Sequence, residues 1–196
     1  MQKSKITAAL EKDLQAEIFD QTENGIYFPR HGIMASGEYF DRINDGEWMR
    51  TSNAIMKEGL LDVLNIYFIQ NKAKQAGFYL ALFSGSAAPA ANWTAANFSS
   101  AANEITSLSE GYTSATRPAF TPIQANEDTY IENLASTARV TFATASQVNV
   151  TGTALLTHSA RGGTSGVLIS AAKYSAARTF QNNDTYDIGY RFTLTS

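Results

Sequence analysis

The clearest structural signal in the chain lies near its end, in the run Tyr186-Asp187-Ile188-Gly189-Tyr190-Arg191-Phe192-Thr193-Leu194. Large apolar residues alternate here with polar or small ones. Successive side chains of a β-strand point to opposite faces, so a period of two places one set in a core and the other in solvent or an interface. The run therefore predicts a strand with one buried face.

Further strands are expected upstream of this run. The hexamer Phe78-Tyr79-Leu80-Ala81-Leu82-Phe83 is apolar on both faces, which is typical of a strand buried in the middle of a sandwich. Four shorter candidates, separated by Gly, Ser, Thr and Ala, are Arg139 to Ala143, Gln147 to Thr151, Ala154 to His158 and Gly166 to Ala171. Short strands with this spacing predict a mainly β fold, an antiparallel β-sandwich or jelly-roll-like domain.

One helix is expected before the buried hexamer, at about residues 53–71. Ser52 or Asn53 can cap it, and its apolar positions extend beyond a simple amphipathic stripe. We therefore predict a helix that is buried on more than one side. Gly59 inside it lowers helix propensity by roughly 1 kcal/mol against Ala, which a close crossing by a strand or another chain would explain.

The first fifty residues differ in texture from the rest. Ile6, Leu10, Leu14 and Ile18 recur every four residues and predict a short amphipathic helix with a narrow apolar stripe. Turn-forming residues follow, and short strands around Ile26-Tyr27-Phe28 and Tyr39-Phe40 fit between them. We divide the chain into an N-terminal arm, residues 1–50, and a β-sandwich domain, residues 51–196. The arm can dock on a neighbour or fold as a β-meander on its own domain.

Residues 84–111 are expected to form a long polar loop, and loops of this length are uncommon unless functional or disordered. Aromatic residues in such a span either pin the loop to its own sheet or contact a partner. Tyr112 and Phe120 are expected to pin it, whereas both readings stay open for Trp93 and Phe98. The candidate partner-binding residues are Ile6, Leu10, Leu14, Ile18, Tyr27, Phe28, Trp93 and Phe98.

Composition narrows the function classes. The chain of 196 residues is 44% hydrophobic and only 17% charged, with a net charge of -3, so nothing favours binding to nucleic acid. It contains no cysteine, which excludes disulfides and thiolate metal sites. Charged residues interrupt the N-terminus before an apolar run forms, so we expect no signal peptide. The most apolar stretch, Leu60 to Ile69, is too short to span a bilayer, so no membrane contact is expected.

Candidate catalytic and metal-binding groups do not assemble into a motif. His31 and His158 are isolated, and Ser165 misses the Gly-x-Ser-x-Gly pattern by one position. The cluster Asn182-Asn183-Asp184 with Asp187 is typical of a turn before a strand and has no EF-hand spacing. The acids Glu127, Asp128 and Glu132 are expected to be solvated instead of catalytic. We therefore predict no enzyme activity, no cofactor and no metal.

Several motifs occur in the order found in a known group of proteins. They are Asn53 followed by Glu58-Gly59-Leu60, the strand Phe78 to Phe83, the loop from Ser84, and Thr179-Phe180 with Asn183-Asp184 leading into Tyr186 to Leu194. In this order the chain, over residues 50–196, resembles small virion proteins of tailed bacteriophages. Here it carries Asn182-Asn183-Asp184 where the resemblance expects Asn-Gly-Asp, and residues 1–50 have no counterpart.

The resemblance implies a structural role in the virion, which is assembled in the host cytoplasm. A head decoration (cement) protein that binds the major capsid protein is favoured, with a tail or head–tail junction component as the alternative. Closed symmetry is the default for such subunits, so a homodimer or homotrimer is expected. A carbohydrate-binding or receptor-binding module is the rival class, in which Trp93 would stack on a sugar.

Overall fold

The computed structural model describes residues 19–21, 27–29, 34–123 and 129–195. The chain divides into two compact units, Met1–Met34 with Thr195–Ser196, and Ala35–Leu194. In the first unit, β1 (Phe19–Gln21) pairs antiparallel with β2 (Tyr27–Pro29), which places a strand close to the predicted one. The second unit begins earlier than the predicted boundary after residue 50, because β3 (Met34–Ile43) belongs to a sheet of the sandwich.

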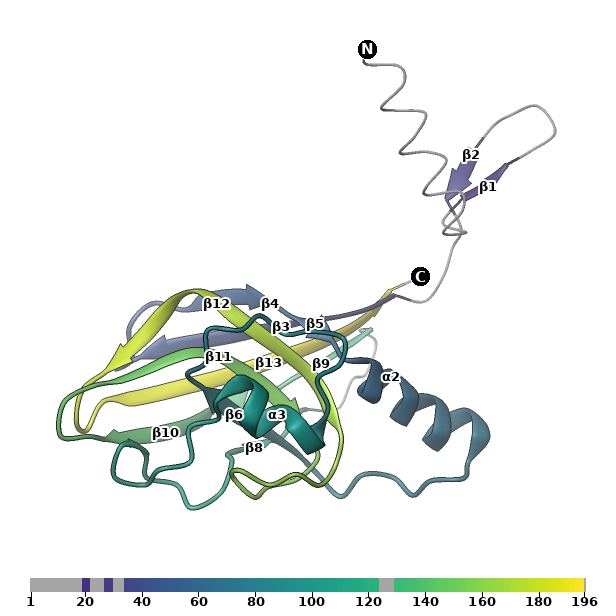
Figure 1. Ribbon diagram of the computed structural model, residues 1–196. Helices are drawn as coiled ribbons and strands as arrows, with labels where there is room; N and C mark the ends of the chain where they lie inside the picture. The colour runs from purple at the N-terminus through teal and green to yellow at the C-terminus, as the bar shows by residue number, and fades with distance from the viewer. Residues whose placement is uncertain (1–18, 22–26, 30–33, 124–128, 196) are drawn as a thin grey trace, which may run out of the picture. The chain divides into compact units, whose positions relative to one another are not determined.

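The second unit is mainly β and contains two antiparallel sheets, as predicted (Figure 1). The six-stranded sheet has the order β4-β3-β13-β10-β7, and β9 pairs with β13. In addition to β3, its strands are β4 (Met49–Ser52), β7 (Gly111–Tyr112), β9 (Tyr130–Glu132), β10 (Ala138–Ala143) and β13 (Thr185–Thr195). The strand predicted from this alternation is confirmed as β13, and Tyr186, Ile188 and Tyr190 are fully buried. The predicted single buried face is not, because Asp187 and Gly189 between them are buried as well.

The five-stranded sheet has the order β5-β12-β11-β6-β8. Its strands are β5 (Ala54–Ile55), β6 (Phe78–Phe83), β8 (Ala119–Phe120), β11 (Val148–Leu156) and β12 (Leu168–Phe180). Strand β6 lies between β11 and β8, and its last four residues are buried, which confirms the predicted inner strand. Two predicted strands merge in β11, where the ladder shifts register between Val150 and Gly152. A Cβ at Gly152 would lie 2.2 Å from the Ala172 carbonyl oxygen.

The core contains tyrosines whose hydroxyl groups find buried partners. Tyr174 and Tyr186 share a hydrogen bond of 2.8 Å, and Tyr39 bonds Ser170 Oγ at the same distance. Burial raises the pKa of Tyr190 to about 12, so its hydroxyl stays protonated at neutral pH. Apolar members of this core include Leu80, Leu82, Phe120, Val140, Phe142, Val150, Phe180 and Ile188.

The predicted loop 84–111 contains a helix, α3 (Ala95–Ala102). A capping box starts it, in which the Asn97 side chain accepts a hydrogen bond from the Thr94 backbone N–H at 2.8 Å. Trp93 and Phe98 pack edge to face at 6.2 Å, and each also meets Phe83. Helix α3 was not predicted, because its Ala, Ser and Asn residues show little apolar periodicity.

The predicted helix 53–71 is shorter than expected and is buried on one side only. The structure has α2 (Lys57–Val63), continued by a π-helix, η1 (Leu64–Ile69). A separate 3-10 helix, η2 (Leu134–Ser136), follows β9. Neither Ser52 nor Asn53 caps α2, because residues 54–55 form β5 and the Asn53 amide donates to the Tyr190 hydroxyl at 2.8 Å. The N-cap position is Met56.

Candidate protein-docking surface

One face of α2 is anchored on strand β12. Met56, Gly59 and Asp62 are buried, and their spacing of three residues places them on the same side of the helix. The Met56 N–H donates to the Ile169 carbonyl oxygen at 2.9 Å. A Cβ at Gly59 would lie 2.9 Å from the Ile169 Cα and carbonyl oxygen, so only glycine permits this approach. The strand crossing predicted as one explanation for Gly59 is confirmed.

Glu58 ties α2 to two neighbouring elements. Its Oε2 accepts hydrogen bonds from the Ala95 N–H at 2.8 Å and from the Leu168 N–H at 2.7 Å. The first of these donors is at the beginning of α3, where a carboxylate also suits the helix dipole. One side chain therefore joins α2, α3 and the first residue of β12.

Asp62 holds the segment that returns from η1 to the sandwich. Its buried carboxylate accepts from Lys72 Nζ at 2.5 Å and from Gln75 Nε2 at 2.9 and 2.8 Å. Both donors follow η1 in the chain. These bonds therefore hold the segment after η1 against α2. With Glu58, they make α2 and η1 a supported projection.

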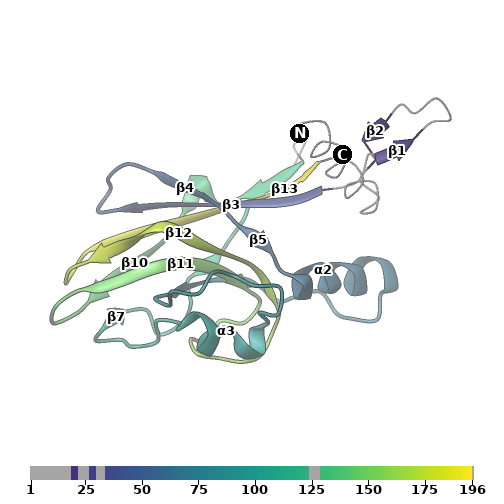
Figure 2. The ribbon, with the colours of Figure 1, turned by 45° about the horizontal axis from the view of Figure 1, so that its top comes forward.

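The other face of this projection is apolar and exposed. We define the apolar ridge as seven residues with exposed fractions of 44% to 76%, namely Leu60, Leu61, Val63, Leu64, Tyr67, Phe68 and Ile69. Figures 1 and 2 show α2 extending beyond the edge of the sheets. Five of the seven residues are aliphatic, so the lower value for an aromatic side chain, about 150 Å² when fully exposed, is the suitable measure, and the ridge presents roughly 600 Å². This equals the upper end of the range of about 300–600 Å² for the largest apolar patch of a typical monomer.

The π-helical half of the ridge is an unusual element. π-helices are rare and are frequently found at functional sites. All six residues of η1 are at least partly exposed, and its C-cap residue Gln70 has a left-handed backbone with φ of 56°. Packing against tertiary neighbours supplies most helical stability in proteins. Within the described part of the chain, η1 receives little of it.

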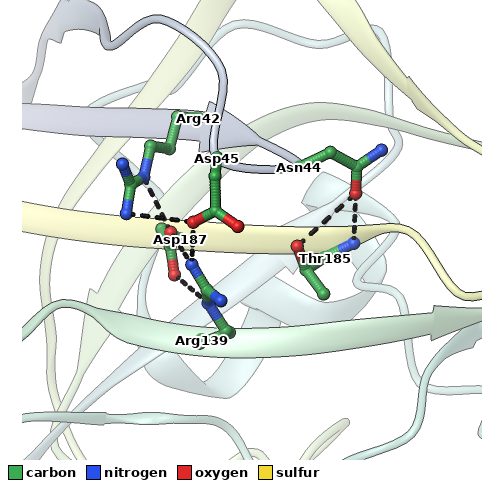
Figure 3. A network of polar contacts seen from close by, with 6 residues as sticks. All are labelled: Arg42, Asn44, Asp45, Arg139, Thr185 and Asp187. Carbon is green, nitrogen blue, oxygen red and sulfur yellow. Dashed lines mark hydrogen bonds and ion pairs between the residues drawn. The ribbon is translucent and has the colours of Figure 1, made fainter.

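The outer face of the six-stranded sheet has the opposite character (Figure 3). Asp187 on β13 accepts from Arg42 Nε at 2.8 Å and from Arg139 Nε at 2.6 Å. Asp45 pairs with both guanidinium groups, and Asn44 Oδ1 accepts from the Thr185 N–H at 2.8 Å. Hydrogen bonds from Arg139 and Arg42 lower the pKa of Asp187 below its ordinary value. These charges therefore satisfy one another.

The predicted partner-binding residues do not coincide with the ridge. Ile6, Leu10, Leu14 and Ile18 lie outside the described residues, and Tyr27 and Phe28 belong to β2. The prediction for Trp93 and Phe98 requires correction, because they are 5% and 0% exposed and pin their segment to the sandwich. Tyr112 and Phe120 are also buried, as predicted. The ridge itself was missed because its apolar residues were interpreted as evidence of burial.

The groups considered for catalysis or metal binding have structural roles where the structure describes them. His158 Nδ1 accepts from the Ala160 N–H at 3.2 Å, and Asp184 Oδ2 accepts from the Gln181 N–H at 2.6 Å in the turn before β13. Glu132 pairs with Arg191 at 2.6 Å. His31, Glu127 and Asp128 lie outside the described residues. Among described residues, no three His, Asp or Glu side chains are grouped as metal ligands, and no helix is long and apolar enough to span a membrane.

Comparison with known proteins does not identify a family. No protein-family model matches the chain, and searches of curated proteins and of solved structures found no significant match.

Proposed function

We propose that this chain is a non-enzymatic structural subunit of a tailed-phage virion, a decoration protein that binds the lattice of the major capsid protein. The observation that carries the proposal is the apolar ridge, whose exposure and rigid support suit a subunit that is permanently assembled with other protein chains. A monomer that left this much apolar surface in water would be prone to aggregate.

The motif behind the phage resemblance has a structural meaning at this site. Asn53 bonds Tyr190 below β5, Glu58 ties α2 to α3 and β12, and Gly59 permits the close approach to Ile169. Leu60 is the first residue of the ridge. The quoted residues are thus those that hold and begin the projection, which supports a role for it in assembly.

Decoration of a capsid does not require a deep pocket. A lattice offers many copies of one modest contact, and simultaneous binding at several of them raises overall affinity by avidity. The low proportion of charged residues suits broad contacts made by apolar groups and neutral hydrogen bonds. The rival carbohydrate-binding reading loses its predicted contact, because Trp93 is buried.

Capsid binding by the full chain tests this proposal. Purified protein is added to capsids that lack it, taken from the phage that encodes it, and the mixture is sedimented. We expect binding in a fixed ratio to the major capsid protein and a higher temperature of capsid disruption. Co-sedimentation with purified tails and not with capsids would contradict the decoration role.

A further inference from the structure

We propose that a second copy of this chain covers the apolar ridge, so that the protein self-associates through α2 and η1. This inference deepens the proposed function, on which it rests for the view that the ridge is a protein contact. It names the occupant of the ridge, and the capsid would then bind the resulting oligomer.

The area of the ridge matches the requirement of a stable pair. A standard protein–protein interface buries about 600–1,000 Å² on each partner, and the exposed side chains of the ridge offer roughly 600 Å². Its seven members carry no charge, and obligate interfaces between identical subunits are the more hydrophobic class. A partner that binds only transiently would be expected to meet a more polar surface.

The distribution of charge around the ridge permits two ridges to face each other. Lys57 precedes the ridge in the chain and Lys74 follows it, and both are exposed. The acidic residues of α2, Glu58 and Asp62, are occupied by hydrogen bonds at its base. Association through the middle of the ridge therefore buries no unpaired ion, which would otherwise carry a large desolvation penalty.

The strongest anchors lie in η1. Phe68 and Tyr67 are the most exposed ridge residues, at 76% and 67%. Buried aromatic residues dominate the binding energy of many interfaces. A partner packed on η1 would also supply the tertiary contacts that this π-helix lacks within the described chain. The ridge and the unusual helix thus have a common explanation.

Sedimentation velocity of the full chain over a concentration series provides the test, with Phe68→Lys as the probe. Leu108→Lys is the matched control, because Leu108 is 54% exposed and lies outside the ridge. We expect wild type and Leu108→Lys to form the same oligomer. Loss of an anchor residue should weaken association of Phe68→Lys by roughly 30-fold or more. Circular dichroism checks that both variants remain folded.

A single introduced cysteine gives an independent measurement, because the chain has none of its own. Under mild oxidation, Val63→Cys should form a covalent dimer, because Val63 lies on the ridge without being one of its anchors, whereas Leu108→Cys should remain uncrosslinked. A wild-type chain that stays monomeric at every concentration would overturn the inference, even if it bound capsids. Unchanged association of Phe68→Lys would also overturn it. An oligomer that depends on the ridge but does not bind capsids would support the inference and contradict the proposed function.

Discussion

The apolar ridge and the outer face of the six-stranded sheet are both exposed to solvent, yet they are built on opposite principles. On the sheet, Asp187 receives two arginines and Asp45 completes the network, so each charge has a partner within the chain (Figure 3). On α2, the carboxylates of Glu58 and Asp62 accept hydrogen bonds from the rest of the subunit, and the apolar side chains of the ridge are exposed. The charges of the first surface have partners within the chain, whereas the second surface exposes apolar side chains to solvent.

Because of this difference, we expect substitutions on the two surfaces to change different properties of the protein. Substitutions in the sheet network or at the base of α2 should change the free energy of unfolding. Substitutions on the ridge should change association and leave the folded subunit largely intact. Equal changes in unfolding free energy for substitutions on both surfaces would contradict this expectation.

The largest effect on folding is expected from Glu58→Ala. Two backbone donors, Ala95 N–H and Leu168 N–H, would lose a charged acceptor, at a cost of about 3 kcal/mol in unfolding free energy. Urea denaturation of the purified chain measures this, with Glu47→Ala as a control at an exposed glutamate. Equal stability of the two variants would show that α2 is not held in this way.

A smaller effect is expected from Asp187→Asn, about 1.5 kcal/mol, because Arg42 and Arg139 reach solvent, which screens the charges. The lowered pKa of Asp187 sets the pH dependence. The carboxylate stabilises the fold above its unfolded pKa, about 3.9, and this contribution is lost as pH falls through the lower folded value. The stability difference between wild type and variant should therefore shrink below about pH 4. Denaturation curves at several pH values provide the check, and a difference independent of pH would contradict the assignment.

Shortening a ridge side chain should lower the unfolding free energy of the subunit less than Asp187→Asn does. Leu64→Ser removes a side chain that is already half exposed, so we expect about 1 kcal/mol in unfolding free energy. The same substitution should weaken association clearly, which sedimentation of the variant measures. A large loss of stability in dilute protein would mean that Leu64 is part of the fold itself.

The smallest effect is expected for Arg50→Ala, which removes an exposed ion pair with Glu38 on the sheet. Such pairs contribute about 0.5 kcal/mol or less and are screened by salt. Thermal unfolding of the variant in low and high salt should show a slight difference that disappears with added salt. A shift that persists in high salt would argue for a packing role of the arginine stem.

The strands were predictable because their signals are local. Period-two alternation identified β13, and two-sided apolarity identified β6 as an inner strand. The start of the sandwich was not predictable, because β3 joins it by pairing with β13 across most of the chain. Hydrophobic periodicity does not reveal such long-range pairing. It also gave no signal for α3, whose residues are mostly Ala, Ser and Asn.

The apolar ridge shows a second reason why burial is hard to predict from sequence. Apolar content in residues 60–69 indicated that these side chains avoid water, and we interpreted this as burial within the same chain. The structure leaves them exposed in one copy. A sequence states that a surface must be covered, but it does not state which molecule covers it. For Trp93 and Phe98 the sequence left both pinning and partner contact open, because their surroundings are polar, and the structure buries them in their own subunit.

Thiol modification of Val63→Cys, in dilute and in assembled protein, measures whether the ridge is a protein contact surface. Val63 lies on the ridge but is not one of its aromatic anchors. The variant thiol should react fast at dilution and at least about tenfold more slowly once the ridge is covered, as expected for an interface residue excluded from water. Leu108→Cys should react at one rate in both states. A Val63→Cys thiol that reacts equally fast in every state, including on capsids, would show that no protein covers the ridge.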